Sequence, residues 1–391
     1  MKILHTVEFY SPSVGGAQEV VKQLSEHLVL LGHDVTVATT KLDDRVDQKI
    51  NGVKIVEFDI SGNYALGYIG NDIEKYKNYL INSKFDAIMN YAAQVWTTDL
   101  LFEVIDKVKT KKFLIPCGFS GLYNPLYADY YRMIPTMLSK YSKTIYPSNN
   151  YRDINFARER GLSNIEIIPN GADEREFSNS HSLDKSDFLS KFNIPPENRL
   201  ILTVGTHTGR KGHSECIKTF LRSPIRDASL IIIGNHLGNQ GCRKSCSIKA
   251  NISNFYNKIT RNGKSIHLLS INRRDTINFY KVSDIFLFMS NIECSPLVLF
   301  ECAASGLPFL AVGVGNSEEI INWTKSGILI NSYQADDGSV YSNYADAISK
   351  LTTTLQNRPT LLKLGKKGKS SWKKKYTWEK LTAQYLNLYK G

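Results

Sequence analysis

Short apolar runs alternate along the first half of the chain with segments whose apolar residues have helical spacing. The first run, residues 2–9, predicts a strand, and the helical spacing over residues 18–31 predicts a helix directly after it. The same pattern predicts further strands at residues 34–39, 53–58, 85–90, 112–116 and 144–147, and helices near residues 71–82 and 98–108. This alternation is typical of a doubly wound α/β unit with a mostly parallel sheet.

A second series of the same kind begins at residue 200. It predicts strands at residues 200–205, 230–234, 267–270, 284–290, 308–312 and 327–330, with a helix at residues 275–282. The polar, charged stretch of residues 174–198 separates the two series and is typical of an interdomain connection. A chain of 391 residues is too long for one compact core. We therefore predict an N-terminal domain of residues 1–175 and a C-terminal domain of residues 176–375.

Residues 284–315 contain the clearest local pattern in the chain. Their apolar run predicts a strand buried on both faces of a parallel sheet, and a helix of about ten residues follows it. Ser295 is a good N-cap, Pro296 suits the first helical position, and Gly306 is placed to end the helix.

This strand-to-helix turn is a candidate anion site. Open α/β sheets bind ligands at the carboxyl ends of their strands, and the first amides of a helix attract negative charge. The amides in question are those of Leu297, Val298 and Leu299, and phosphate is the obvious ligand. Two carboxylates flank them, Glu293 and Glu301, and neither belongs in an apolar core.

A double glycine, Gly15 and Gly16, precedes the first predicted helix. It allows backbone amides to approach a ligand at the helix N-terminus. It lacks the three spaced glycines of the dinucleotide fingerprint, so a dinucleotide oxidoreductase is disfavoured.

Composition narrows the function class only slightly. Charged residues make up 22% and hydrophobic residues 42%, as in an ordinary soluble globular protein. The net charge of +12 favours phosphorylated ligands, an anionic membrane surface or nucleic acid, and nucleic-acid binding is not expected because only the charge supports it. The N-terminus lacks the apolar segment of a signal peptide, so a cytoplasmic location is expected.

The six cysteines are expected to be reduced thiols, since no export signal is present. Cys242 and Cys246 have three residues between them, and His236 lies nearby in a long basic segment, residues 235–258. No second closely spaced ligand pair completes a zinc site, so no metal site is predicted. The basic segment itself reads either as a specificity insertion or as a solvated loop.

The block of sixteen residues from Glu293 to Pro308 resembles the E-x7-E signature of a large family of retaining glycosyltransferases with the GT-B fold, glycosyltransferase family 4 or "glycosyl transferases group 1". Three other landmarks resemble the family in the same order along the chain. They are the glycine loop at Gly15 and Gly16, the Pro169-Asn170-Gly171 segment, and Lys211-Gly212.

The resemblance implies two Rossmann-like domains facing a central cleft, with a last helix, about residues 376–391, that packs back on the N-terminal domain. It implies retaining transfer of a hexosyl group from a nucleoside-diphosphate sugar, with UDP or GDP expected and no metal required, to a glycan or lipid-linked acceptor. Glu293 would contact the donor sugar and Glu301 the ribose hydroxyls. The remaining donor-binding residues would be Gly15, Gly16, Arg210, Lys211, Pro296, Leu297 and Val298.

Two departures from the family pattern keep alternatives open. Thr206 stands where the family usually has an arginine, which Arg210 would have to replace, and Cys117 stands where many members have a histidine. The alternatives are a GT-B sugar-nucleotide epimerase and a catalytically impaired, glycosyltransferase-like binding subunit.

Two further segments bear on the acceptor. The tyrosine-rich residues 122–143 suit ordinary packing, with a membrane interface or lipid-linked acceptor as the second interpretation. The lysine cluster of residues 366–375 reads as a solvated helix face, with anionic membrane phosphates as the alternative. The family resemblance suggests a role in cell-surface polysaccharide or glycolipid synthesis, with the enzyme peripheral at the inner face of the plasma membrane.

Overall fold

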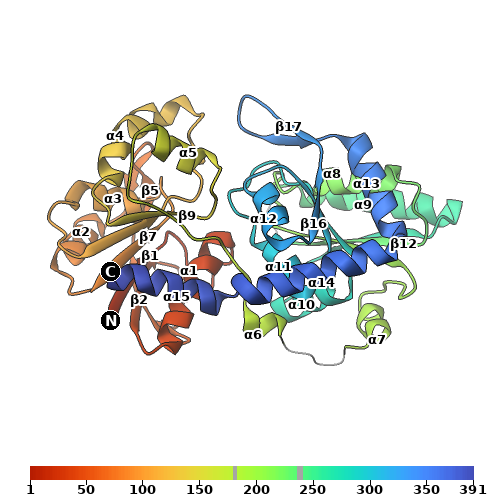
Figure 1. The fold of residues 1–391 in the computed structure, drawn as a ribbon, viewed down its shortest axis with the longest axis horizontal. Helices are drawn as coiled ribbons and strands as arrows, with labels where there is room; N and C mark the ends of the chain where they lie inside the picture. Colours follow the sequence, from red (N-terminus) through yellow and green to blue (C-terminus); the bar gives the residue numbers. More distant parts are fainter. Residues whose placement is uncertain (179–182, 236–240) are drawn as a thin grey trace. The chain divides into compact units, whose positions relative to one another are not determined.

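The computed structural model describes residues 1–178, 183–235 and 241–391. The chain forms two compact units, each built around its own sheet (Figure 1). The first unit comprises residues 1–170 and 378–391, and the second comprises residues 171–377. Each is described by itself below.

The first unit contains an eight-stranded sheet in the order β10-β9-β8-β7-β1-β2-β4-β3. All neighbouring strands are parallel except β3 and β4. Its strands are β1 (Lys2–Thr6), β2 (Asp34–Thr40), β3 (Lys49–Ile50), β4 (Val53–Phe58), β7 (Ala87–Tyr91), β8 (Lys111–Ile115), β9 (Lys143–Tyr146) and β10 (Ile165–Ile167), with a separate hairpin of β5 (Ser61–Asn63) and β6 (Gly67–Ile69).

The helices of this unit are α1 (Gly16–Leu30), α2 (Ile73–Asn82), α3 (Trp96–Val104), α4 (Ala128–Leu138), α5 (Arg152–Glu159) and α15 (Trp378–Lys390), with a 3-10 turn at Pro125–Tyr127. Helix α15 comes from the far end of the chain and buries aromatic rings against this sheet. The Tyr389 ring lies 4.9 Å from that of Phe113 on β8, and its hydroxyl lies 3.3 Å from Nε2 of His5 on β1. These contacts make α15 part of the core of the first unit.

The second unit contains a six-stranded, all-parallel sheet in the order β13-β12-β11-β14-β15-β16. Numbered within the unit, the order is 3-2-1-4-5-6, the arrangement of the doubly wound dinucleotide-binding fold. The strands are β11 (Arg199–Val204), β12 (Ala228–Ile233), β13 (Lys264–Leu269), β14 (Ile285–Phe288), β15 (Phe309–Val312) and β16 (Gly327–Ile330), with a hairpin of β17 (Ser332–Gln334) and β18 (Val340–Ser342).

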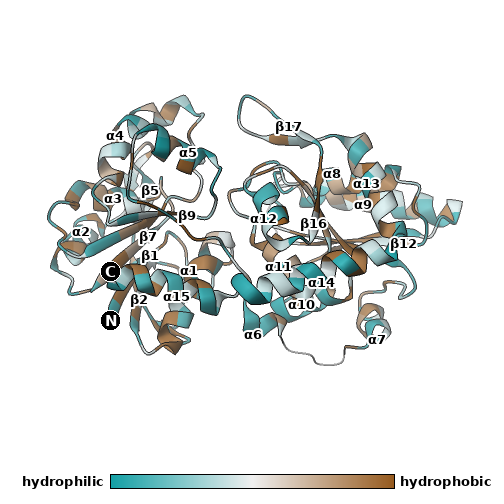
Figure 2. Ribbon diagram, in the orientation of Figure 1, coloured by the Kyte–Doolittle hydropathy of each residue, from teal (hydrophilic) through white to brown (hydrophobic). Residues whose placement is uncertain are grey.

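The helices of the second unit are α6 (Glu174–Phe177), α7 (Lys185–Ser190), α8 (His213–Arg222), α9 (Arg243–Thr260), α10 (Arg273–Val282), α11 (Leu297–Ser305), α12 (Ser317–Thr324), α13 (Tyr344–Gln356) and α14 (Arg358–Lys375). Apolar residues concentrate on the strands of both sheets, and hydrophilic residues lie along the helices (Figure 2). This distribution is expected when helices cover both faces of a parallel sheet.

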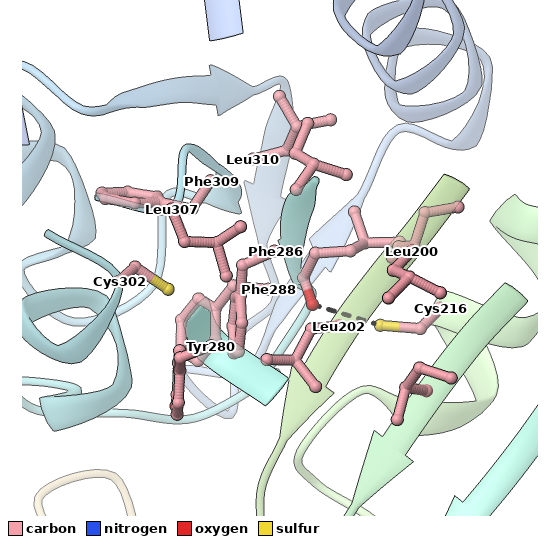
Figure 3. Packing of buried hydrophobic residues seen from close by; sticks show 14 of the residues in the cluster. Leu200, Leu202, Cys216, Tyr280, Phe286, Phe288, Cys302, Leu307, Phe309 and Leu310 are labelled. Atoms are coloured by element: carbon pink, nitrogen blue, oxygen red, sulfur yellow. Dashed lines mark hydrogen bonds between the residues drawn. The ribbon is translucent and has the colours of Figure 1, made fainter. Parts of the chain in front are cut away.

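The core of the second unit is built from the central strands and the helices beside them (Figure 3). Phe286 on β14 stacks on Tyr280 of α10, with ring centroids 5.7 Å apart and planes 6° from parallel. The Cys216 thiol of α8 donates a hydrogen bond to the Leu287 carbonyl at 3.6 Å. Because β14 is covered on both faces, its four residues are all buried, as the continuous apolar run predicts.

The structure corrects the prediction for residues 235–258. Residues 243–260 form the long helix α9, whereas His236 lies outside the described residues. The hydrophobic pattern did not predict this helix, because its buried positions are Cys246, Ala250 and Asn257. Its large apolar side chains lie on the exposed face. The exposed apolar residues are Ile248, Ile252, Phe255, Tyr256 and Ile259.

Helix α11 begins one position later than predicted. Pro296, with extended backbone (φ −70°, ψ 114°), takes the N-cap position in place of Ser295. The end of the helix is as predicted, with Gly306 in the left-handed conformation at φ +76°.

The packing interpretation of the tyrosine-rich segment is confirmed for Tyr130, Tyr131 and Tyr141, which are buried. The lysine cluster lies on α14 with every lysine exposed, as expected for a solvated helix face. Among the described residues, no helix combines the length and apolarity needed to cross a membrane.

Candidate functional site

The strand order of the second unit fixes where a ligand is expected. Connections run in opposite directions on the two sides of the β11–β14 pair, and open α/β sheets bind ligands at the carboxyl edge of such a switch point. The loop after β11 is residues 205–212, and the loop after β14 is residues 289–296. These two loops contain four of the nine site residues predicted from the sequence: Arg210, Lys211, Glu293 and Pro296.

Direct hydrogen bonds tie the two loops together. The carbonyl of Arg210 accepts from the backbone N–H of Asn291 at 2.9 Å and from the Ser290 hydroxyl at 3.1 Å. Gly212 makes this contact possible, because it has φ +70° and a Cβ there would lie 1.9 Å from the Met289 carbonyl oxygen. The loops therefore form one supported structure at the switch point.

Lys211 and Glu293 meet at this point. Lys211 Nζ lies 2.6 Å from Glu293 Oε1, and the Ser290 hydroxyl lies 3.0 Å from the same oxygen. The Glu293 side chain is 13% exposed and that of Lys211 33%, so the pair is partly withdrawn from water. An ammonium can bind a phosphate group and a carboxylate can accept hydrogen bonds from hydroxyl groups, so this pair could hold a ligand that carries both.

Helix α11 starts beside this pair. Its third amide, that of Leu299, already donates to the Pro296 carbonyl at 3.2 Å, so the prediction that Leu299 holds an anion is wrong. Leu297 and Val298 are the first two residues of the helix and are partly exposed. Their amides, together with the helix dipole, favour an anion at this end.

Glu301 lies on the second turn of α11 and is held by Arg273, the first residue of α10. Arg273 Nη2 lies 2.6 Å from Glu301 Oε1, and its Nε lies 3.1 Å from Glu176 Oε2. Burial works against the charge of Arg273, but the two carboxylates outweigh it and raise the pKa of the guanidinium. Glu301, only 8% exposed at its side chain, is thereby kept as an oriented acceptor.

Arg210 and Thr206 occupy the rest of the β11 loop. Arg210 is exposed, and its amide donates to the Thr208 hydroxyl at 3.2 Å. Thr206 is partly buried, and its carbonyl accepts from the Thr208 amide at 2.7 Å. The structure thus places Arg210 next to Lys211 on the solvent side of the loop.

The glycine loop belongs to the first unit and is described within it. Gly15 is the N-cap of α1, and Gly16 is its first residue. The loop follows β1, and the switch point of this sheet lies between β1 and β7, so Gly15 and Gly16 are at the corresponding ligand-binding edge of the first sheet. A Cβ on Gly16 would contact no atom within 4 Å, which leaves this helix end open.

The same edge contains two loops with unusual backbone, of which the sequence analysis named only Cys117. After β7, Ala92 and Gln94 have φ of 71° and 64°, and after β8, Cys117 and Phe119 have φ of 59° and 46°. Non-glycine residues seldom adopt such angles, and they concentrate at functional sites. The sequence pointed to Cys117 through the family's histidine position, whereas Ala92, Gln94 and Phe119 had only their position after two neighbouring strands as a signal.

Buried carboxyl groups support these loops. Asp153 accepts from the Gly118 amide at 2.7 Å, and Asp99 accepts from the Tyr130 hydroxyl at 2.9 Å, which in turn lies 3.0 Å from the Gln94 amide. Burial raises the pKa of Asp99 to about 7 and that of Asp153 to about 6. Neither group has an ion-pair partner among the described residues, in contrast to Glu293 and Glu301.

Two family models match the chain, one over each half. Residues 14–176 match the family model described as "Glycosyltransferase Family 4", and residues 184–370 match the one described as "Glycosyl transferases group 1". An uncharacterized glycosyltransferase of Methanocaldococcus jannaschii is 25% identical over an alignment that covers 100% of this chain and 98% of that protein.

Solved structures share the whole fold at low sequence identity. Sucrose-phosphate synthase from Thermosynechococcus elongatus superposes with a TM-score of 0.79 at 17% identity, covering 100% of this chain and 98% of that one. Anabaena HepE in complex with UDP-glucose gives a TM-score of 0.72 at 14% identity, with 99% and 98% covered.

Proposed function

Since the chain is a glycosyltransferase with the GT-B fold, we propose that it is a retaining enzyme that moves a hexosyl group from a nucleoside-diphosphate sugar to a glycan or lipid-linked acceptor. The observation that carries the proposal is the Lys211–Glu293 pair at the switch point of the second sheet. Lys211 Nζ and Glu293 Oε1 lie 2.6 Å apart, so the pair offers a cation to a diphosphate and an anion to sugar hydroxyls.

Donor binding would begin with an exchange of partners. A diphosphate carries more charge than a single carboxylate, so it would draw Lys211 away from Glu293, with Arg210 and the amides of Leu297 and Val298 as further donors. Pro296 caps this helix end, and the Gly15-Gly16 loop is the proposed contribution of the first unit. Glu293, released from Lys211, would then accept hydrogen bonds from the sugar hydroxyls.

Glu301 would bind the ribose of the nucleotide. A carboxylate accepts from two neighbouring hydroxyl groups, and Arg273 holds this one in a fixed orientation at 2.6 Å. Because HepE was solved with UDP-glucose, UDP is the first nucleotide to test, and GDP is the second. No metal is required by this scheme.

The chemistry would be the departure of the nucleoside diphosphate and the arrival of the acceptor oxygen on the same face of the sugar. Lys211 and the helix amides stabilise charge that develops on the leaving phosphate, which is the larger electrostatic demand. A phosphate oxygen of the leaving group takes the acceptor proton, and the negative charge of Glu293 supports the positive anomeric carbon.

The acceptor would bind to the first unit, where the left-handed loops after β7 and β8 give a fixed surface. A glycan or glycolipid of the cell surface is the acceptor class we propose, and a cytoplasmic enzyme peripheral at the inner face of the plasma membrane would reach it. The exposed lysines of α14 would supply the membrane contact.

Ligand-induced thermal stabilisation tests the donor site. At about a hundred times its dissociation constant, the correct nucleoside diphosphate stabilises the protein by about 2.7 kcal/mol. UDP, GDP, ADP and CMP are compared, with NAD as the negative control. The shift is expected with one diphosphate and is expected to disappear in Lys211→Ala and Glu301→Ala, while Lys367→Ala, an exposed lysine of α14, keeps it.

Product analysis then separates the alternatives. A transferase releases the nucleoside diphosphate only as an acceptor is glycosylated, whereas an epimerase converts the sugar nucleotide without an acceptor. Nucleotide binding with no turnover of either kind would identify a binding subunit. No stabilisation by any nucleotide would overturn the proposed donor site.

A further inference from the structure

Four metal-binding side chains gather beside the β11 loop of the second unit. His207 lies in that loop, His213 is the first residue of α8, and Cys242 and Cys246 lie at the start of α9. His207, His213 and Cys246 are buried, and Cys242 is partly buried. Three separate segments therefore bring imidazoles and thiols to one place.

The spacing of the donor atoms is that of a tetrahedral metal site. Nδ1 of His207 lies 3.1 Å from Nδ1 of His213, and Cys242 Sγ lies 3.5 Å and 3.7 Å from these two nitrogens. A zinc ion with ordinary bond lengths and tetrahedral angles separates two nitrogens by roughly 3.3 Å and a nitrogen and a sulfur by roughly 3.6 Å. A zinc ion therefore fits within this triangle of atoms with shifts of only a few tenths of an ångström.

Cys246 is the candidate for a fourth ligand, although its thiol lies outside the group formed by His207, His213 and Cys242, whose donor atoms are all within 4.8 Å of one another. It lies on α9, four residues after the N-cap Cys242, and its amide donates to the Cys242 carbonyl at 2.9 Å. Two imidazoles and two thiols are the ligand set of many structural zinc sites.

The surrounding backbone leaves room for both rings. A Cβ on Gly234 would lie 3.3 Å from Cδ2 of His207, and one on Gly205 would lie 3.6 Å from Nε2 of His213. The Cys242 amide also donates to the His207 carbonyl at 3.2 Å, so the α9 start and the β11 loop are already joined. The rings are thus held in position by close packing against glycine backbone.

We propose that His207, His213, Cys242 and Cys246 bind a structural zinc ion. Cys242 and Cys246 alone did not predict the site, because the second ligand pair, His207 and His213, has five residues between its members and lies some thirty residues upstream. The two histidines flank Lys211, so the ion fixes the loop that carries it. Metal binding itself does not depend on the proposed function, whereas this effect on Lys211 does.

Metal analysis of the full chain tests the proposal directly. Protein purified without chelator is expected to contain about one zinc ion per chain, and the content is expected to fall to near zero in Cys242→Ser and His213→Asn. Cys117→Ser and His267→Asn are the matched controls, because they remove the same residue types outside the cluster and should keep the metal. Zinc retained in the double variant His213→Asn/Cys242→Ser would overturn the assignment.

Cobalt substitution tests the site in the wild-type chain, so the result does not depend on whether a ligand variant folds. The wild-type chain reconstituted with Co²⁺ is expected to show a thiolate-to-cobalt charge-transfer band and the intense visible bands of tetrahedral coordination. A Cys246→Ser variant that keeps stoichiometric metal with an unchanged charge-transfer band would remove Cys246 from the ligand set. Absence of tetrahedral cobalt bands in the folded wild-type chain would overturn the site.

The link to the donor loop is a separate measurement. Removing zinc with a chelator is expected to lower the thermal midpoint and to reduce the stabilisation by the nucleotide found above. Stoichiometric zinc with no nucleotide response in any form would sink the proposed function and leave the metal site intact. A nucleotide response unaffected by zinc removal would show that the ion does not hold Lys211.

Discussion

The carboxyl edges of the two sheets share a strand topology but stabilise their loops in different ways. In the second unit the edge holds charged pairs, Lys211 with Glu293 and Arg273 with Glu301. In the first unit the corresponding loops rest on left-handed backbone and on the buried carboxyl groups of Asp99 and Asp153, for which the described residues offer no ion-pair partner. The loops of the second edge are thus held by ion pairs, and those after β7 and β8 by backbone conformation and hydrogen bonds to buried carboxyl groups.

The strongest test of this contrast is neutralisation of Glu293. Glu293→Gln keeps the size of the side chain but removes the charge that would support the anomeric centre, so the rate of sugar transfer is expected to fall by about 10²- to 10³-fold. The measurement is the steady-state kcat with the nucleotide sugar identified by thermal stabilisation.

Glu318→Gln is the matched control, because Glu318 is exposed in the first turn of α12. It should leave kcat unchanged. If Glu293→Gln transfers sugar at the rate of the control, charge is not what distinguishes the second edge.

Disrupting the contact between the loops after β11 and β14 is expected to have the next largest effect. Gly212→Ala puts a Cβ 1.9 Å from the Met289 carbonyl oxygen, so the loops must separate. We expect a loss of about 2–4 kcal/mol in the free energy of unfolding together with loss of nucleotide-induced stabilisation. Chemical denaturation and thermal shift measure the two effects.

Gly209→Ala separates the cost of the steric clash from the cost of the left-handed backbone conformation. Gly209 also has positive φ, at +85°, but a Cβ there meets no atom within 4 Å. Its cost should be about 1 kcal/mol, from the left-handed conformation alone. Equal losses in the two variants would mean that the loop contact adds nothing to the second edge.

The smallest effect is in the pH dependence of the first unit, where two buried groups act in opposite directions. The pKa of Asp99 is raised to about 7, so the native state takes up a proton between about pH 7 and pH 4 that the unfolded state does not, and stability from this group falls as pH rises through that window. Burial lowers the pKa of His5 to about 3, so stability from His5 falls as pH drops below about 6.5.

Each group should change the free energy of unfolding by about 2 kcal/mol between pH 8 and pH 5, with opposite sign. Asp99→Asn is therefore expected to lose more stability than the wild type on acidification, and His5→Gln to lose less. Thermal midpoints at pH 8 and pH 5 measure both. Identical pH profiles for wild type and Asp99→Asn would show that Asp99 is ionised at both pH values and that the first edge also holds charge.

The sequence predicted the sheets well because buried parallel strands are continuous apolar runs. Val53–Phe58 and Gly327–Ile330 agree with the predicted bounds at both ends. The prediction from sequence failed for α9. The buried side of this helix is made of Cys246, Ala250 and Asn257, and its exposed side contains isoleucines and aromatic rings. A periodicity argument assumes that large apolar residues face the core, and this helix reverses that assumption.

The site was predictable only in part. The residues that follow β11 and β14 could be named in advance, because they lie at strand ends and match a known motif. The pairing of Lys211 with Glu293 spans 82 residues, and no local pattern encodes it. Arg273 and the left-handed backbone at Ala92 and Cys117 were recognised only with the fold, since neither an ion-pair partner nor a backbone angle can be read from the local sequence.

Because α15 is the last helix of the chain but belongs to the first unit, the first unit cannot complete its core until synthesis is nearly finished. Its tyrosines complete the core around His5 and Phe113, yet residues 378–391 leave the ribosome only after the whole of residues 171–377. At about 5–20 residues per second, the start of the chain waits roughly 10–40 seconds for this helix after residue 170 has been made. During that interval the second unit can fold as one continuous segment, while the first unit, although translated first, still exposes the apolar surface that α15 will cover.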